Sequence, residues 1–91
     1  MKIIEIKKVN GAPCLRATVI IELYGNCIIR GFSIIEHDGK LKILFPEVRW
    51  IRQGQIYKQD LLKLKPDLRK MITTEIIAAW GLLQNQEKGE Q

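Results

Sequence analysis

Apolar and polar residues alternate along several stretches of the first half of the chain, and a period of two is typical of β-strands that bury one face. The alternation is clearest from Leu15 to Leu23, where apolar side chains recur at every second position. Lys2 to Lys8 and Leu41 to Phe45 show the same pattern over fewer residues. These three ranges are predicted to be strands.

Short turn sequences separate the predicted strands. Residues 10–13 are Asn-Gly-Ala-Pro, residues 24–26 are Tyr-Gly-Asn and residues 37–39 are His-Asp-Gly. Glycine and asparagine tolerate a positive φ and proline fixes its own φ, so each of these sequences favours a turn. The turn at residues 24–26 predicts a hairpin into a fourth strand over Cys27 to Ile35. Strands joined in hairpin succession form an antiparallel sheet.

The alternation stops at Pro46, and a different kind of segment follows. Residues 47–59 are largely polar and basic, and they include two aromatic side chains. Gln53 and Gly54 are expected at the tip of a loop. Only a weak, polar strand is predicted in this segment, from Gln55 to Gln59.

Pro66 begins a segment with helical spacing. Proline suits the first turn of a helix because its missing N–H would be unpaired there, and Asp67 suits the positive end of the helix dipole. Apolar residues then recur every three or four positions, which predicts an amphipathic helix. Residues 85–91 are polar and are expected to form a disordered tail. The apolar stripe of the helix consists of Leu68, Ile72, Ile76, Ala79 and Leu83.

Together these elements predict an α+β fold: an antiparallel sheet of four to five strands with one C-terminal amphipathic helix packed on a face. A chain of 91 residues is expected to form a single domain, here over residues 1–84. A domain of this size buries only about 60–65% of the surface of its unfolded chain, so pairing with a second copy would stabilise it.

Isoleucines outside the predicted core indicate a homodimer. Over residues 27–35, strict alternation would place Ile28 and Ile34 on one face of the strand. Ile29 and Ile35 would then lie on the other face. One helix covers only one face of a sheet, so half of these side chains would be exposed in a monomer, and the helix adds two more apolar residues outside its stripe. The predicted interface consists of Ile28, Ile29, Ile34, Ile35, Ile77 and Trp80.

The net charge of +5 is concentrated in one part of the chain. From Arg49 to Lys70 there are seven basic and two acidic residues, so this segment carries a charge of +5, equal to the net charge of the whole chain. A localised basic segment favours a polyanionic partner such as nucleic acid. The chain has no apolar run near the ~18 residues that span a bilayer, and no secretory signal, so a cytoplasmic protein without a membrane partner is expected.

Few residues in the chain are suited to catalysis. His37 is the only histidine, and it lies beside Asp38 in a predicted turn, where a solvated imidazole is expected. Cys14 and Cys27 lack the C-x-x-C spacing of metal or redox sites. A disulfide between them is an alternative, but reduced thiols are favoured. Neither a Cys–His dyad nor a metal site of the two cysteines and the histidine has support in the spacing. A non-enzymatic protein is predicted, with no cofactor, metal or small-molecule substrate.

The basic segment also contains Trp50 and Tyr57, and this combination indicates a nucleic-acid site. Arginine and lysine neutralise phosphates, and flat aromatic rings stack on unpaired bases. The alternative is that either ring covers the edge of the sheet, while its basic neighbours lie over apolar surface. The candidate nucleic-acid-binding residues are Arg49, Trp50, Arg52, Tyr57, Lys58, Lys63, Lys65, Arg69 and Lys70.

Several short motifs in the chain resemble those of one known family. They are the sequences LRATVIIEL and IIRGFSIIEHDGKLKILFP, then a basic segment, and a G-x-x-Y-K element ahead of the C-terminal helix. In this pattern the chain, from roughly Met1 to Trp80, resembles the stage V sporulation protein G (septation protein) family. The matching positions in the family's characteristic stretch are Pro46, Arg49, Gly54, Tyr57 and Lys58.

The resemblance implies a small sheet-plus-helix fold that dimerises, in a bacterial regulatory protein that binds DNA or RNA and takes part in septation and sporulation control. From the residues alone, the alternative is a non-enzymatic interaction module that applies its basic face to an acidic protein or a membrane surface. Affinity for mixed-sequence DNA or RNA, measured against affinity for anionic vesicles at matched salt, distinguishes these functions.

Overall fold

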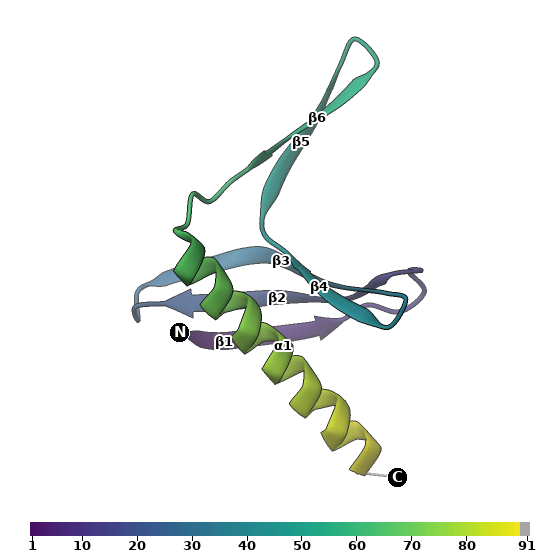
Figure 1. Cartoon of the computed structure of the whole chain (residues 1–91), viewed down its shortest axis with the longest axis vertical. Helices are drawn as coiled ribbons and strands as arrows, with labels where there is room; N and C mark the ends of the chain where they lie inside the picture. The colour runs from purple at the N-terminus through teal and green to yellow at the C-terminus, as the bar shows by residue number, and fades with distance from the viewer. Residues whose placement is uncertain (90–91) are drawn as a thin grey trace.

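The computed structural model describes residues 1–89 and confirms the α+β fold (Figure 1). The first two strands have the bounds that the alternation predicts, the third extends two residues further, and the fourth begins and ends one residue earlier. In chain order the elements are β1 (Lys2–Lys8), β2 (Leu15–Leu23), β3 (Cys27–His37), β4 (Lys40–Leu44), β5 (Glu47–Arg52), β6 (Gln55–Asp60) and α1 (Pro66–Gly89).

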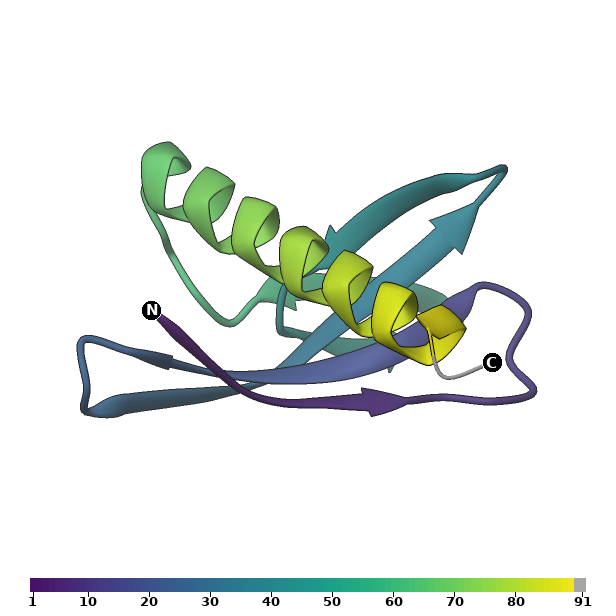
Figure 2. The ribbon, with the colours of Figure 1, turned by 90° about the horizontal axis from the view of Figure 1, so that it is seen from below.

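Strands β1 to β4 form one antiparallel sheet, in which each strand pairs with its neighbour in the sequence. Helix α1 crosses one face of this sheet diagonally (Figure 2). The predicted helical stripe faces the sheet, with Ile72 and Ile76 fully buried and Leu68 and Leu83 packed against the core. The buried core consists of Ala17, Val19, Ile21, Leu23, Phe32, Ile34, Ile43, Phe45, Ile72, Ile76 and Trp80.

A β-bulge in β3 decides which of its side chains face the helix. Between Ile29 and Phe32, β3 has two residues, whereas the facing stretch of β2 has only Ile20. Gly31 lies in this bulge with a φ of 97°, a conformation that L side chains rarely adopt. Because side chains alternate between faces with a period of two, one extra residue moves all those beyond it to the opposite face.

The bulge overturns the predicted faces of the β3 isoleucines. Ile29 and Ile34 both face α1, because each pairs across the strands with a core residue of β2, and Ile34 is fully buried. Ile28, 59% exposed, and the half-buried Ile35 lie on the outer face. The predicted alternation therefore holds on each side of Gly31 but not across it.

Trp80 and Ile34 belong to the core of the single chain, which corrects the predicted dimer interface. Only 5% of the surface of Trp80 is exposed, and the ammonium of Lys8 lies 5.9 Å from the centre of its ring. Ile77 of the same helix is half-buried and packs against the core. Trp80 and Ile34 are not available to a second copy, so this part of the predicted interface is wrong.

Residues 47–60 form a β-hairpin that projects from the body of the molecule (Figure 1), and we call this hairpin the arm. Strands β5 and β6 pair only with each other, in a regular antiparallel register. Gln53 and Gly54 form its two-residue turn, both with positive φ, of 52° and 76°, which suits the twist of a tight hairpin. The residues before this turn, for which no strand was predicted, form β5. The predicted weak strand is confirmed, one residue longer, as β6.

The base of the arm is fixed to the body at Pro46. This proline is buried, its ring lies against Gly31 of the bulge, and its carbonyl accepts a hydrogen bond from the N–H of Leu61 at 3.0 Å. The bond closes the hairpin where the chain enters and leaves it. Proline thus ends the sheet, as predicted, and also sets the point from which the arm projects.

Helix α1 is longer than the sequence predicts. It runs through Gly81 and continues to Gly89, so residues 85–89 of the predicted disordered tail are helical. Residues 84–88 contain no proline or glycine, and glutamine, glutamate and lysine are good helix formers, which explains why the helix extends beyond Leu83, the last residue of its apolar stripe. The predicted tail at residues 90–91 lies outside the described residues.

Candidate nucleic-acid interface

One face of the arm is aromatic and basic. In the register of the hairpin, Trp50 pairs directly with Tyr57, and their rings stack with centroids 5.8 Å apart and planes inclined by 17°. Each side chain remains about two-fifths exposed, 42% for the tryptophan and 41% for the tyrosine. Paired side chains of a hairpin share a face, so we define the aromatic face as Val48, Trp50, Arg52, Gln55, Tyr57 and Gln59.

Arg52 lies beside the aromatic stack and completes a small hollow with it. Trp50, Arg52, Gln53 and Tyr57 line this hollow, whose volume is about 270 Å³. The tyrosine hydroxyl is held by a hydrogen bond to Oε1 of Gln55 at 2.9 Å. Within residues 1–89, Arg52 makes no ion pair, and the aromatic face contains no acidic residue. The face combines flat rings with an uncompensated positive charge.

The opposite face of the arm has a different chemistry. It consists of Glu47, Arg49, Ile51, Ile56, Lys58 and Asp60, and we call it the isoleucine face. Arg49 forms an ion pair with Glu47 at 2.7 Å, so its charge is compensated within the strand. Lys58 lies across from Arg49, and Asp60 lies across from Glu47. Two positive charges thus meet two negative charges on this face.

The remaining candidate residues lie at the base of the arm and on the first turns of α1. Lys63 and Arg69 line a groove of about 460 Å³ with Asp60 and Leu62. The guanidinium of Arg69 lies over the ring of Phe45, 4.2 Å from its centre, which holds the arginine against the core. Lys65 and Lys70 are exposed, and Lys70 lines a separate hollow along the helix.

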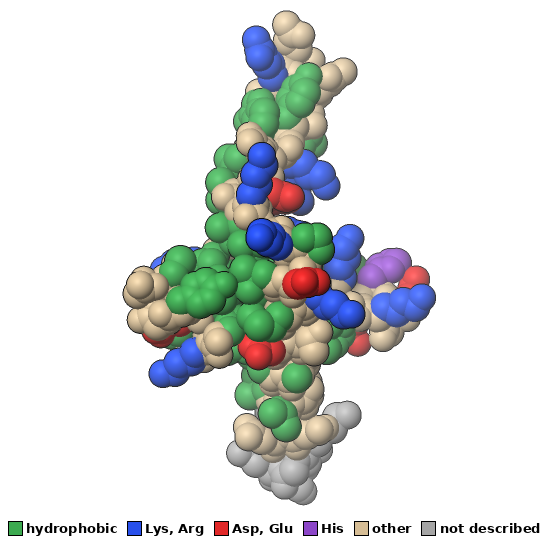
Figure 3. Space-filling model, turned by 60° about the vertical axis from the view of Figure 1, so that its left-hand side comes forward, with side chains coloured by type: hydrophobic (Ala, Val, Ile, Leu, Met, Phe, Trp, Pro, Cys, Tyr) green, Lys and Arg blue, Asp and Glu red, His purple; other side chains and the backbone are tan. Residues whose placement is uncertain are grey.

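The structure therefore divides the nine candidates into groups instead of one continuous site. Trp50, Arg52 and Tyr57 lie together on the aromatic face, and Arg49 and Lys58 lie on the isoleucine face. The other four come after the arm in the sequence. Figure 3 shows Lys and Arg side chains at separate places along the arm and around the body, with hydrophobic side chains between them. The two aromatic rings stack on each other within the arm, so neither serves as a lid on the four-stranded sheet.

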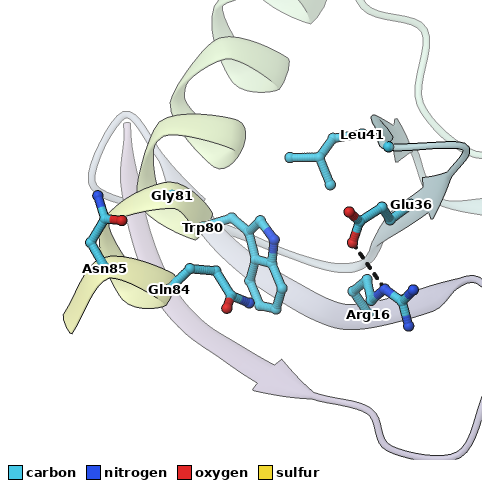
Figure 4. A pocket seen from close by; sticks show the side chains of 8 residues that line it. Arg16, Glu36, Leu41, Trp80, Gly81, Gln84 and Asn85 are labelled. Carbon is cyan, nitrogen blue, oxygen red and sulfur yellow. Dashed lines mark hydrogen bonds and ion pairs between the residues drawn. The ribbon is translucent and has the colours of Figure 1, made fainter. Parts of the chain in front are cut away.

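A separate cavity lies between the C-terminal half of α1 and the hairpin of β3 and β4 (Figure 4). Its volume is about 570 Å³, and on the side formed by the strands Nε of Arg16 and Oε2 of Glu36 form an ion pair at 3.1 Å. Arg16 is the extra residue in a second bulge, between Leu15 and Ala17, and a bulge of this kind re-aims a side chain. Because the charges compensate each other, the cavity is not suited to phosphate. No sequence signal pointed to it.

The other polar candidates lie apart from the arm. His37 is exposed at the end of β3 and pairs with Asp38 of the following turn at 3.3 Å. Both cysteines are free; Cys14 precedes β2 and Cys27 pairs with the last residue of that strand, so the length of β2 separates them and excludes a disulfide. Residues 1–89 contain no cluster of three or more potential metal ligands. In the same range, no helix has the length and apolar character needed to cross a membrane.

No family model matches the chain, and no curated protein or solved structure matches it. The resemblance to the stage V sporulation protein G family rests on the short motifs alone and stays a prediction.

Proposed function

We propose that this chain binds nucleic acid through the aromatic face of the arm. The observation that carries the proposal is the exposed stack of Trp50 and Tyr57 beside Arg52, on a hairpin that projects away from the body. Aromatic rings that stack on bases, together with a cation that has no acidic neighbour, are the two elements of single-strand recognition. The projection leaves the face accessible to a long polymer.

Exposed basic side chains that come after the arm in the sequence support the same proposal. Lys63, Lys65 and Lys70 are exposed and make no ion pair within residues 1–89. Contacts of this kind add affinity through phosphates without reading the sequence. Arg49 contributes less than the sequence predicts, because Glu47 already compensates its charge. Arg52 and the three lysines are therefore the principal phosphate ligands in the proposal.

In this proposal the protein is a non-enzymatic bacterial regulator of the septation and sporulation type, as the motif resemblance implies. The competing function is docking of the basic residues on an acidic protein or an anionic membrane. Anionic vesicles and an acidic peptide, offered at the same salt concentration as mixed-sequence DNA and RNA, provide the comparison. Tighter binding to either of these than to every oligonucleotide would favour the competing function.

The salt dependence of binding tests the electrostatic part of the proposal. If about four basic side chains engage phosphates, the slope of log affinity against log salt is about −3 to −4. Affinity for DNA or RNA then falls on the order of a hundredfold between about 50 and 200 mM salt, as measured by fluorescence anisotropy. Absence of binding to any oligonucleotide at low salt would refute the proposal.

Two substitutions test the aromatic face itself. Trp50→Ala should weaken binding to single strands by about 5- to 150-fold, the range expected for one stacked base, and weaken binding to duplexes less. Arg52→Ala should flatten the salt slope by about one phosphate contact. The matched control is Lys2→Ala with Lys42→Ala, which removes two exposed charges from the sheet and should change little. Equal losses in the control would indicate diffuse attraction without a defined site.

A further inference from the structure

The cavity beside the C-terminal half of α1 has the size of a small-molecule site. Its volume of about 570 Å³ lies within the range of about 300–1,000 Å³ that is usual for such sites. One wall comes from the helix and the other from the strands of the body (Figure 4). No residue of the arm lines it, so a ligand in this cavity would be separate from the proposed nucleic-acid interface.

The indole N–H of Trp80, on the helix wall, is a donor without a partner. Only 5% of this residue is exposed, and its nitrogen makes no hydrogen bond within residues 1–89. The nitrogen is not sealed in the core either, because the same residues contain no fully buried side-chain N or O atom that lacks a partner. Figure 4 shows it on the edge of the ring that faces Leu41 and Glu36. An indole N–H in such a place usually has an acceptor, so the acceptor must come from within the cavity.

The strand wall offers ionic groups without a net charge. Arg16 and Glu36 are joined only through Nε and Oε2, at 3.1 Å, and their side chains remain 40% and 39% exposed. Oε1 of the glutamate can accept a further hydrogen bond, and the guanidinium keeps its other N–H donors. Because the pair is neutral as a whole, a ligand with a net charge gains little from it. A ligand with separate positive and negative groups can be bound by both walls.

The space between the polar groups is bounded by apolar surface. Leu41 is half-buried on the strand wall, and its side chain points toward the helix (Figure 4). Gly81 lines the helix wall and has no side chain, and a Cβ added there would meet nothing within 4 Å. An apolar group of a ligand can therefore lie against Leu41 and beside Gly81, where its burial would add affinity.

We propose that this cavity binds a small zwitterion with an apolar side group, of the chemical class of apolar amino acids and short apolar peptides. The ammonium group binds Oε1 of Glu36, and the carboxylate accepts the indole N–H of Trp80. The amide of Gln84, which is half-buried next to the indole, is a second donor for the carboxylate. The sequence predicted no small-molecule substrate, because these residues are far apart in the chain and come together only in the fold.

The indole N–H signals in the NMR spectrum of the isotope-labelled chain test the proposal directly. The chain has two tryptophans, so each gives one such signal, and Trp50→Phe assigns them. L-Leucine and L-leucyl-L-leucine, added to about 10 mM, should shift the Trp80 signal until it saturates, whereas the Trp50 signal should stay in place. The relative affinities of these two probes distinguish an amino acid from a short peptide.

Two analogues of the probe test whether both charged groups are needed. N-acetyl-L-leucine lacks the ammonium group and L-leucinamide lacks the carboxylate, so each should bind at least about tenfold more weakly than L-leucine or its dipeptide. Failure of both zwitterions to shift the Trp80 signal would overturn the proposal. Binding of either analogue as tight as that of the zwitterions would also overturn it.

Variants of the cavity test the assigned contacts. Glu36→Gln should weaken zwitterion binding by about 10- to 150-fold, the range for one hydrogen bond to a charged group. Asp38→Asn is the matched control, because it removes a carboxylate from the same hairpin outside the cavity and should leave the affinity unchanged. Gly81→Leu should fill the cavity and abolish binding without lowering Tm, since its Cβ enters open space. Thermal unfolding checks that each variant is folded. Wild-type affinity in a folded Glu36→Gln or Gly81→Leu variant would overturn the proposal.

Discussion

Gly31 and Gly81 differ in their backbone conformation and in the space around them, so a side chain at each position should affect the fold differently. Gly31 has a φ of 97° in the bulge of β3, and an added Cβ would lie 3.5 Å from the Cβ of Pro46. It is an isolated glycine within an apolar strand, which is the sequence signal for a bulge. Gly81 has no positive φ, and an added Cβ would meet nothing within 4 Å. The first glycine is required by the backbone, and the second is not.

Alanine substitutions at these two positions should change stability in opposite directions. Gly31→Ala forces an L residue into a left-handed conformation, at a cost of about 1–2 kcal/mol. Gly81→Ala in the helix should stabilise by up to about 1 kcal/mol. In a domain of this size, 1 kcal/mol shifts Tm by about 4–8 °C, so thermal unfolding monitored by circular dichroism resolves both effects. An unchanged Tm for Gly31→Ala would mean that the bulge relaxes without strain.

At the scale of the elements, the body and the arm differ in what holds them together. The strands of the body pack their inner face under α1, whereas β5 and β6 pair only with each other. Periodicity predicted the body strands and the helix because burial imposes that pattern on the sequence. It did not predict β5, because a hairpin exposed on both faces imposes no apolar alternation. Residues 85–89 were assigned to a tail for a related reason: they are polar, and polar residues can continue a helix without extending its apolar stripe.

Backbone amides of the arm should exchange with solvent much faster than those of β2 and β3. Local opening of a hairpin without apolar support costs far less free energy than opening of the central strands. Hydrogen–deuterium exchange measured by mass spectrometry at sub-micromolar protein, where a dimer dissociates, provides the comparison. Protection of β5 equal to that of β2 under these conditions would show that the arm is more stable than its contacts indicate.

At the scale of the whole molecule, the arm at one end and the C-terminal part of α1 at the other make the chain longer than a compact domain (Figure 1). The radius of gyration of the Cα atoms is 14.6 Å, and the principal extents are 51 × 34 × 19 Å. A compact chain of this length would have a radius of gyration of about 12 Å. The sequence placed the basic and aromatic candidates in one segment. It could not show that the hairpin register separates them onto two faces, or that Glu47 compensates Arg49.

Replacing residues 48–59 with two glycines should leave a folded body. The chain enters and leaves the arm at adjacent points, where the carbonyl of Pro46 bonds the N–H of Leu61, so a short turn can close the gap. Small-angle scattering should show a smaller radius of gyration than that of the full-length monomer under the same conditions. Binding to single-stranded oligonucleotides should be lost. Cooperative thermal unfolding of the shortened chain checks that the body is intact, and collapse of the body would show that the arm is needed for folding.

The attachment of the arm at Pro46 also has an evolutionary consequence. Since the body folds around a core that includes no residue of β5 or β6, substitutions in the arm escape selection for folding. Positions such as 50 and 57 can then drift freely unless a partner constrains them. Among homologous sequences, invariance in the arm would therefore report on binding, whereas invariance in β2 or α1 would report mainly on packing.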